Sequence, residues 1–242
     1  MSVRINYFGR FGNKTFQYAC ARLFAKEHGL KLLTPFPAMD QEILPAIPEE
    51  DGAVAEGPEF HFTEVDDVFA RRYAPSKYVF HAYFQKWWWY HDRRAEVERF
   101  FRPTPTEKRN QGDIVVNLRL EDYWGYNLVI HPKWYLDILA KETFRNLFIV
   151  LDQPDERYLA YFKAYKPVVI KTMPWNDWNI LRSFDRILCA NSTFSWWACF
   201  FSEASKIWTF KRWIGNPNVV LSEFPGAIAL DGPFWHEMEE KK

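Results

Sequence analysis

The segment from Asn191 to Ser195 joins small polar residues to the predicted start of a helix. An apolar run ends at Ala190, and Asn191, Ser192 and Thr193 follow it directly. Ser192 or Thr193 is expected to cap the helix, whose first N–H groups then lack partners within it. Those N–H groups, the positive helix end, the Asn191 amide and the Ser192 and Thr193 hydroxyls suit a diphosphate without any metal. An ordinary helix cap that binds no ligand is the alternative.

A second polar segment follows the apolar run at residues 114–118. Arg119 is expected at the end of a strand, where its guanidinium can bind a phosphate at two points. Asp122 can orient that guanidinium or accept a proton, and Glu121 adds another carboxylate beside it. A surface ion pair that contributes little to stability is the alternative.

A glycine-containing turn lies between a predicted strand and a predicted helix near the N-terminus. Gly9 and Gly12 allow the backbone to turn tightly and to approach a ligand. Asn13 is expected to cap the helix and to point its amide at that ligand. The spacing differs from the dinucleotide pattern G-x-G-x-x-G, and a plain turn is the alternative.

Four further side chains are weaker candidates for ligand contacts. Trp87 and Trp88 offer flat apolar faces on which a sugar can stack, with core packing as the alternative. Asp152 and Asp177 lie next to the ends of predicted elements, where a carboxylate can accept hydrogen bonds from a guanine base. Helix capping is the alternative for both aspartates.

Composition limits the class of ligand. The 242 residues contain 31 Lys and Arg against 31 Asp and Glu, so the zero net charge argues against nucleic-acid binding. The sequence contains no H-E-x-x-H and no D-x-D, so neither a metal nor another cofactor is expected. Protein donors would then have to neutralise a bound nucleotide.

Cysteine usage and hydropathy predict a cytoplasmic protein. The three cysteines are too few and too scattered for a disulfide framework or a zinc site, which favours free thiols in a reducing compartment. No apolar run approaches the length of about 18 residues that a membrane span requires. The N-terminal residues also lack the apolar stretch of a secretory signal.

The spacing of apolar runs predicts an α/β protein with two domains. In the C-terminal half, runs at 114–118, 147–151, 167–170, 186–190 and 206–210 alternate with helical segments. This alternation is typical of a doubly wound parallel sheet, which binds ligands beyond the carboxyl ends of its strands. In the N-terminal half, a strand at 3–8, a helix at 14–27 and a strand at 30–33 are expected. The polar, Pro-containing segment at 102–113 predicts domains at 1–108 and 109–242.

The three polar segments together resemble glycosyltransferase family 11, the α-1,2-fucosyltransferases, and the wider group of GDP-fucose-dependent enzymes. Gly9, Gly12 and Asn13, followed by Phe-Gln-Tyr-Ala at 16–19, match the opening loop of that family. Residues 117–123 occupy the frame of its donor motif, His-x-Arg-x-Gly-Asp-Tyr. Residues 191–197 match its third motif, Asn-Ser-Ser/Thr-Phe-Ser-Trp-Trp, without a change.

The resemblance implies an inverting, metal-independent transferase with a GT-B-like fold of two facing Rossmann-like domains and a reduced N-terminal half. The C-terminal domain would bind GDP-fucose, and the N-terminal domain would face the glycan acceptor. Trp87 and Trp88 would bind the acceptor, and Arg119, Glu121 and Asp122 would be catalytic. The expected donor-binding residues are Gly12, Asn13, Asn117, Arg119, Asp152, Asn191, Ser192, Thr193 and Ser195.

Two substitutions within the donor motif leave other functions open. Asn117 stands where the family has His, and Glu121 stands where it has Gly. Another nucleotide sugar is therefore an alternative donor. A carbohydrate-binding relative that has lost catalysis is the other alternative.

Overall fold

The computed structural model describes residues 2–48, 58–63, 67–69, 77–108, 111–213 and 226–239. Residues up to Thr104 belong to one compact unit, and the described residues from Pro105 onward belong to another. The boundary predicted between residues 108 and 109 lies a few residues after this division. Among the described residues, no helix is both long and apolar enough to cross a bilayer.

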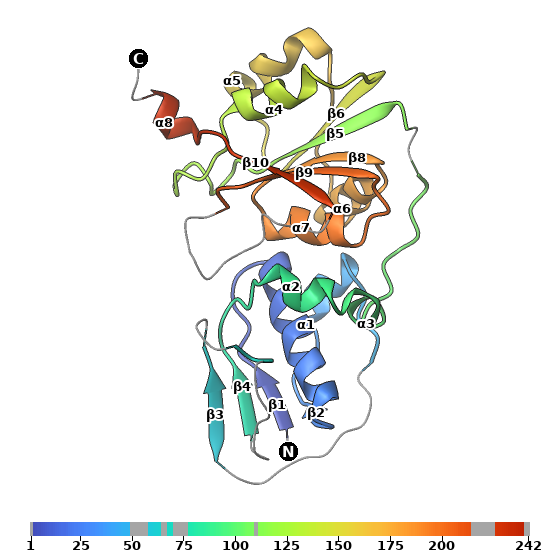
Figure 1. The fold of residues 1–242 in the computed structure, drawn as a ribbon, viewed down its shortest axis with the longest axis vertical. Coiled ribbons are helices and arrows are strands. Elements are labelled where there is room, and N and C mark those ends of the chain that lie inside the picture. The colour runs from blue at the N-terminus through green and yellow to red at the C-terminus, as the bar shows by residue number, and fades with distance from the viewer. Residues whose placement is uncertain are drawn as a thin grey trace. The chain divides into compact units, whose positions relative to one another are not determined.

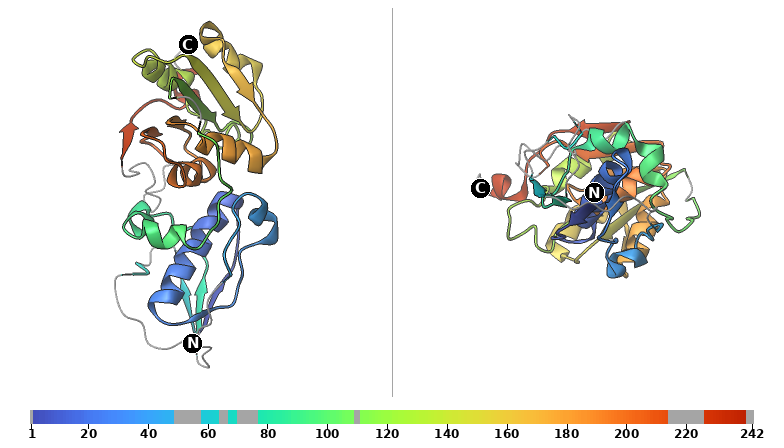
Figure 2. Two further views of the ribbon diagram at one scale, coloured as in Figure 1. Left: turned by 90° about the vertical axis from the view of Figure 1, so that its right-hand side faces the viewer. Right: turned by 90° about the horizontal axis from the view of Figure 1, so that it is seen from below.

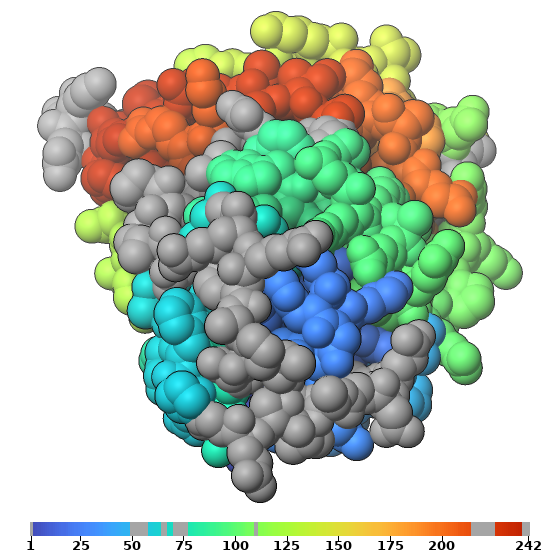
Figure 3. All heavy atoms as spheres, turned by 60° about the horizontal axis from the view of Figure 1, so that its bottom comes forward, coloured from blue at the N-terminus to red at the C-terminus, as the bar shows by residue number. Residues whose placement is uncertain are grey.

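The first unit is built on a four-stranded parallel sheet with the order β2-β1-β4-β3. Its strands are β1 (Ser2–Ile5), β2 (Lys31–Leu32), β3 (Glu59–Phe62) and β4 (Lys77–Phe80). Helix α1 (Phe11–Glu27) lies against this sheet (Figure 1 and Figure 2). The short helices α2 (Trp87–His91) and α3 (Arg94–Glu98) pack beside α1, as the green and blue surfaces in Figure 3 show. A 3₁₀ turn, η1 (Ala38–Glu42), interrupts the Pro-rich segment that follows β2.

Helix α1 begins earlier than the predicted start at residue 14. Arg10 occupies the N-cap position, so the prediction that Asn13 caps this helix is wrong. Asn13 instead lies in the first helical turn, where its own backbone N–H is one of those that a capping side chain would bind. The helix ends at Glu27, which confirms the predicted end, and Gly29 follows the C-cap residue His28 with a φ of +62°.

The turn that enters α1 depends on the absence of a side chain at Gly9. Gly9 has a φ of +76°, and a Cβ atom on it would lie 2.4 Å from Asn13 Nδ2. We expect Gly9→Ala to lower the free energy of unfolding by about 2–5 kcal/mol, because it combines left-handed strain with a steric clash. Urea unfolding measures this loss.

Gly29→Ala is the matched control for that substitution. Gly29 has a φ of +62°, but no atom of the described residues lies within 4 Å of the position that its Cβ would take. This variant is therefore expected to lose only about 1–2 kcal/mol. Equal losses in the two variants would contradict the close contact between Gly9 and Asn13.

The second unit is built on a six-stranded parallel sheet with the order β10-β9-β8-β5-β6-β7. Its strands are β5 (Asp113–Leu118), β6 (Asn146–Leu151), β7 (Val168–Ile170), β8 (Arg186–Cys189), β9 (Lys206–Phe210) and β10 (Ala227–Leu230). The first five confirm the apolar runs predicted from the sequence. The central strands β5 and β8 are buried almost throughout, which explains why they read as continuous apolar runs.

Helices cover both faces of this sheet. Figure 1 shows α4 (Pro132–Leu139) and α5 (Glu156–Leu159) on one face, and α6 (Pro174–Arg182) and α7 (Thr193–Phe200) on the other. A 3₁₀ segment, η2 (Ala160–Tyr165), continues α5, and α8 (Trp235–Glu239) follows β10. The prediction of a doubly wound parallel α/β sheet is therefore confirmed.

The strand order places a topological switch between β5 and β8. The chain passes from β5 outward to β6 and β7, and then returns to β8 on the other side of β5. In doubly wound sheets, ligands bind at the carboxyl ends of the two strands that flank such a switch. The loop after β5 begins with Arg119, and the loop after β8 contains Asn191 and Ser192.

The aromatic residues supply much of the core of each unit. Trp178, Trp196 and Trp197 are fully buried in the second unit, and Tyr18, Phe16 and Phe24 are fully buried in the first. Core packing thus accounts for most of the high aromatic content. The three cysteines are free and buried, as predicted.

Candidate functional site

Arg119 and Asp152 meet at the carboxyl ends of two adjacent strands. The β5–β6 ladder ends with Leu118 opposite Leu151, so the next residues on both strands are Arg119 and Asp152. Arg119 Nη1 lies 2.6 Å from Asp152 Oδ2. The other oxygen, Oδ1, accepts hydrogen bonds from the N–H groups of Leu120 and Gln153, both at 2.9 Å. Asp152 is therefore held in place by the backbone of two loops.

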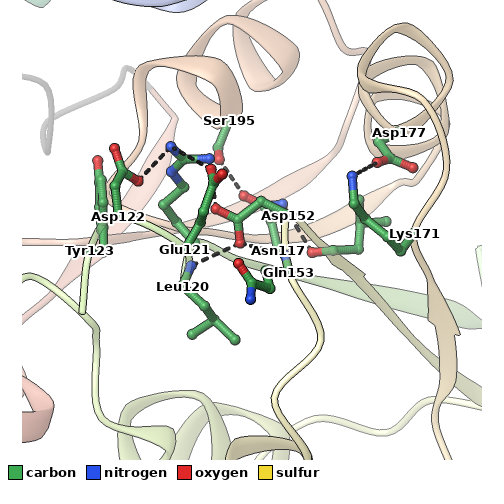
Figure 4. Close-up of polar contacts among 12 residues, drawn as sticks. Asn117, Leu120, Glu121, Asp122, Tyr123, Asp152, Gln153, Lys171, Asp177 and Ser195 are labelled. Atoms are coloured by element: carbon green, nitrogen blue, oxygen red, sulfur yellow. Dashed lines mark hydrogen bonds and ion pairs between the residues drawn. The ribbon is translucent and has the colours of Figure 1, made fainter. Parts of the chain in front are cut away.

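Two more carboxylates from the loop after β5 face the same guanidinium. Arg119 Nη2 lies 2.6 Å from Asp122 Oδ1 and 3.7 Å from Glu121 Oε2. Figure 4 shows Glu121, Asp122 and Asp152 gathered at one place, although they come from two loops. We call this group of Arg119 and its three carboxylates the Arg119 cluster.

The Arg119 cluster has an excess of negative charge. Oxygen atoms of Glu121, Asp122 and Asp152 all lie within 4.8 Å of one another, a spacing that also suits a hard cation. Arg119 already lies within ion-pair distance of all three, so its charge would oppose a metal ion there. A sequence search for D-x-D misses this cluster because Asp152 comes from a different strand.

The turn between β8 and α7 has the predicted shape, but its hydrogen bonds differ from those expected. Ser192 occupies the N-cap position of α7, with φ −126° and ψ 133°, yet its side chain does not cap the helix. Asn191 is buried, and its Nδ2 donates to the carbonyls of Leu128 and Trp213, both at 3.0 Å. Asn191 therefore ties together three loops at this edge of the sheet.

Tyr123 connects the Arg119 cluster to this turn. Its hydroxyl donates to the backbone carbonyl of Asn191 at 2.8 Å. The Arg119 guanidinium lies 5.3 Å from the centre of the Tyr123 ring, within the range of a cation–π contact. Arg119 and the turn at residues 191–193, predicted separately from the sequence, are thus joined through one side chain.

Asn117 and Ser195 form a buried pair beneath these loops. Ser195 Oγ donates to Asn117 Oδ1, and Asn117 Nδ2 donates to the carbonyl of Val150 at 3.0 Å. Both residues are buried, so the pair links β5, β6 and α7 from within. Direct contact of either side chain with a donor stays a prediction.

Asp177 lies away from the Arg119 cluster, in the first turn of α6. Its Oδ1 accepts hydrogen bonds from the N–H and the hydroxyl of Thr172, at 2.9 and 2.6 Å. Lys171 Nζ lies 3.8 Å from Oδ2 (Figure 4). Met173 occupies the N-cap position of α6, so Asp177 does not cap this helix as the alternative prediction held, and its contact with a guanine base stays a prediction.

In the first unit, the predicted residues near β1 meet the loop after β4. Asn13 Oδ1 accepts a hydrogen bond from Gln85 Nε2 at 2.9 Å, and Gly12 is buried beside it in the first turn of α1. Phe84, next to Gln85, has a φ of +54°, which is unusual for a residue other than glycine. No local pattern singles out Gln85, because its partner lies 72 positions away.

The two tryptophans predicted to bind an acceptor differ in exposure from their neighbours. Trp89 and Tyr90 are buried in the core, whereas Trp88 is 37% exposed. Trp87 packs edge-to-face on Trp88, with ring centres 5.9 Å apart. An accessible aromatic face is therefore present at Trp88, and its contact with a sugar stays a prediction.

Two other groups near the carboxyl ends of the strands are neutral. Burial raises the pKa of the Cys189 thiol well above its usual range, so this thiol is not a reactive nucleophile. Burial likewise raises the pKa of Tyr135, whose hydroxyl donates to the carbonyl of Asn117 at 3.2 Å. Among the described residues at this switch point, the charged groups available for chemistry are those of the Arg119 cluster.

Comparison with known proteins rests on structure. No protein-family model and no curated protein matches the sequence. A crystal structure of the NodZ α-1,6-fucosyltransferase soaked with GDP-fucose is similar, with a TM-score of 0.53, 12% identity, and coverage of 83% of this chain and 92% of that one. The E. coli heptosyltransferase WaaC with ADP gives a TM-score of 0.44 and 9% identity over 96% of this chain and 94% of that one. The likeness to NodZ, together with the two parallel α/β sheets, shows that the chain has a GT-B glycosyltransferase fold.

Proposed function

We propose that the protein is an inverting, metal-independent glycosyltransferase that transfers L-fucose from GDP-fucose to a hydroxyl of a glycan, in α-1,2 linkage. One observation carries this proposal: Arg119 and the turn at residues 191–193 lie at the carboxyl ends of the two strands that flank the switch point. A guanidinium and a helix N-terminus are both donors for a diphosphate.

The proposed reaction is a direct displacement at the sugar. The acceptor oxygen forms a bond to the anomeric carbon, while the bond from that carbon to the β-phosphate oxygen of GDP breaks. Negative charge then grows on the β-phosphate, where Arg119 and the first-turn N–H groups of α7 stabilise it. The acceptor hydroxyl loses its proton as the new bond forms.

Asp122 and Glu121 are the candidate bases for that proton. Their side chains are 31% and 45% exposed, whereas that of Asp152 is 17% exposed and bonded to backbone. The first two can therefore reach an acceptor hydroxyl more readily than Asp152 can. A general base must reach the acceptor hydroxyl, which in an inverting displacement approaches the face of the sugar opposite the departing phosphate.

The choice of donor and linkage has two sources of support. The resemblance to family 11 in residues 9–19, 117–123 and 191–197 favours GDP-fucose and an α-1,2 linkage. The similar NodZ crystal was soaked with GDP-fucose, but NodZ is an α-1,6-fucosyltransferase. Both sources of support thus favour fucose as the transferred sugar, whereas they differ in linkage. Analysis of the product would determine which hydroxyl of the acceptor is modified.

The charge of the Arg119 cluster favours a second candidate, a non-catalytic carbohydrate-binding relative. Three carboxylates surround one guanidinium, and this excess of negative charge opposes the approach of a diphosphate. Asn117, which replaces the His of the family, also keeps transfer from another nucleotide sugar open. The first alternative predicts that no GDP is released from GDP-fucose, and the second predicts that another nucleotide sugar binds in its place.

A ligand screen followed by a transfer assay tests the proposal. Thermal unfolding would be recorded with GDP, ADP, UDP and their sugars in the presence of EDTA, since a ligand of the folded form raises its stability. We expect GDP and GDP-fucose to raise the midpoint, and GDP to be released when fucosyl acceptors are added. Binding without release would favour the non-catalytic relative, and a shift with another nucleotide alone would favour another donor.

A further inference from the structure

Asp152 and Asp122 contact different nitrogen atoms of the Arg119 guanidinium, and the two carboxylates differ in backbone hydrogen bonding and in exposure. Asp152 contacts Nη1, and Asp122 contacts Nη2, each at 2.6 Å. Asp152 is anchored through Oδ1 by the N–H groups of Leu120 and Gln153. Asp122 is about twice as exposed, at 31% against 17% of the side chain.

We propose that Asp152 is a positioning residue that fixes Arg119, while Asp122 occupies the place that the donor phosphate takes. This inference rests on the proposed function and assigns the two carboxylates separate roles within it. A phosphate approaching Nη2 can displace the exposed Asp122 carboxylate, because that side chain can turn toward water. Asp152 cannot follow it, since two backbone N–H groups hold it in place.

The inference changes the role predicted for Asp152. A carboxylate that accepts hydrogen bonds from guanine needs an accessible oxygen. Oδ1 of Asp152 already accepts two backbone hydrogen bonds, and Oδ2 is buried in its ion pair with Arg119, where it has no hydrogen-bond partner among the described residues. The carboxylate of Asp152 therefore interacts with Arg119 instead of with the guanine base of the donor. Because Asp152 already holds the guanidinium in position, less free energy is needed to orient it when negative charge develops on the leaving phosphate.

Isosteric amide variants separate the two roles. Asp152→Asn keeps an oxygen for the Leu120 and Gln153 N–H groups but removes the negative charge beside Nη1. We expect it to lower kcat/KM for GDP-fucose by about tenfold to a hundredfold, because the guanidinium loses the ion pair that holds it in place and small misplacements of a catalytic group cost this much. Asp122→Asn removes a negative charge that competes with the phosphate for Arg119. The Kd of this variant for GDP should therefore be about threefold to tenfold lower than that of wild type. Asp137→Asn, on an exposed carboxylate of α4 paired with Lys133, is the matched control.

A double-mutant cycle decides whether Asp152 acts through Arg119. If it does, Asp152→Asn causes no further loss of kcat/KM once Arg119→Ala is present. A purely structural role would give the same loss in both backgrounds, and that additive result would overturn the inference. A weaker Kd for GDP in Asp122→Asn would overturn the displacement of Asp122.

The wild-type protein distinguishes failure of this inference from failure of the proposed function. Wild type that neither binds GDP nor releases it from GDP-fucose would overturn the function, and this inference with it. Wild-type turnover with additive losses in the cycle would overturn only the inference. Thermal unfolding of each variant, set beside Asp137→Asn, shows that the compared proteins are folded.

Discussion

Arg119→Ala is expected to lower kcat with GDP-fucose by about 10²–10³-fold, the usual cost of removing one preorganised donor from a developing oxyanion. Arg119→Lys should lose a similar amount, because an ammonium group cannot bridge two oxygens as the guanidinium does. Steady-state kinetics with purified protein measure both effects. The residue lies at the end of β5, and Tyr123 connects it to the turn before α7.

The control for this prediction is another arginine of the same unit. Arg157 has a side chain that is 79% exposed and pairs with Asp155 instead of a member of the Arg119 cluster. Arg157→Ala should therefore keep near-normal turnover. Near-normal turnover in Arg119→Ala as well would remove this residue from the mechanism.

Trp197→Ala is expected to cause the largest loss of stability, about 3–5 kcal/mol in the free energy of unfolding. Trp197 is fully buried in α7 and packs against Trp196, Phe200 and Phe201, with ring centres 4.9, 5.2 and 5.8 Å away. Removing the indole leaves a cavity that these rings cannot fill. Chemical denaturation followed by circular dichroism measures the loss.

Trp175→Ala provides the comparison, since Trp175 lies in the same unit but is 44% exposed. This variant should change the free energy of unfolding by about 1 kcal/mol or less. A similarly small change in Trp197→Ala would contradict a packing role for the end of the 191–197 motif. The expected outcome assigns Trp197, at the end of that motif, to the core.

The second unit was largely predictable because its strands are buried on both faces. Buried parallel strands read as continuous apolar runs, and the amphipathic segments between them read as helices. The edge strand β10 escaped prediction, although Ala227–Leu230 is apolar throughout, because it is only four residues long and its residues alternate between half-buried and exposed positions. The position of Arg119 and of residues 191–193 at the carboxyl ends of strands could be predicted, since they follow such runs.

The first unit was harder to predict. Strands β3 and β4 are only four residues long and lie among aromatic residues whose spacing favours neither strand nor helix. Helix α3 is also short, since it spans only Arg94–Glu98. Short elements carry too few residues to show a period.

The contacts within the candidate site depend on register, which no local pattern reveals. Asp152 reaches Arg119 because β5 and β6 pair with Leu118 opposite Leu151. Gln85 reaches Asn13 because β1 and β4 are neighbours in the first sheet. Each residue is visible in the sequence, but its partner is set only by the order of the strands.

A crystal structure of the protein with GDP, grown in EDTA, tests the central claim most directly. We predict that the β-phosphate lies within hydrogen-bond distance, about 2.7–3.2 Å, of Arg119 and of N–H groups in the first turn of α7. In the same structure, the Asp122 carboxylate should have left Nη2 while Asp152 still holds Nη1. GDP bound with its phosphates away from both Arg119 and residues 191–193 would contradict the account.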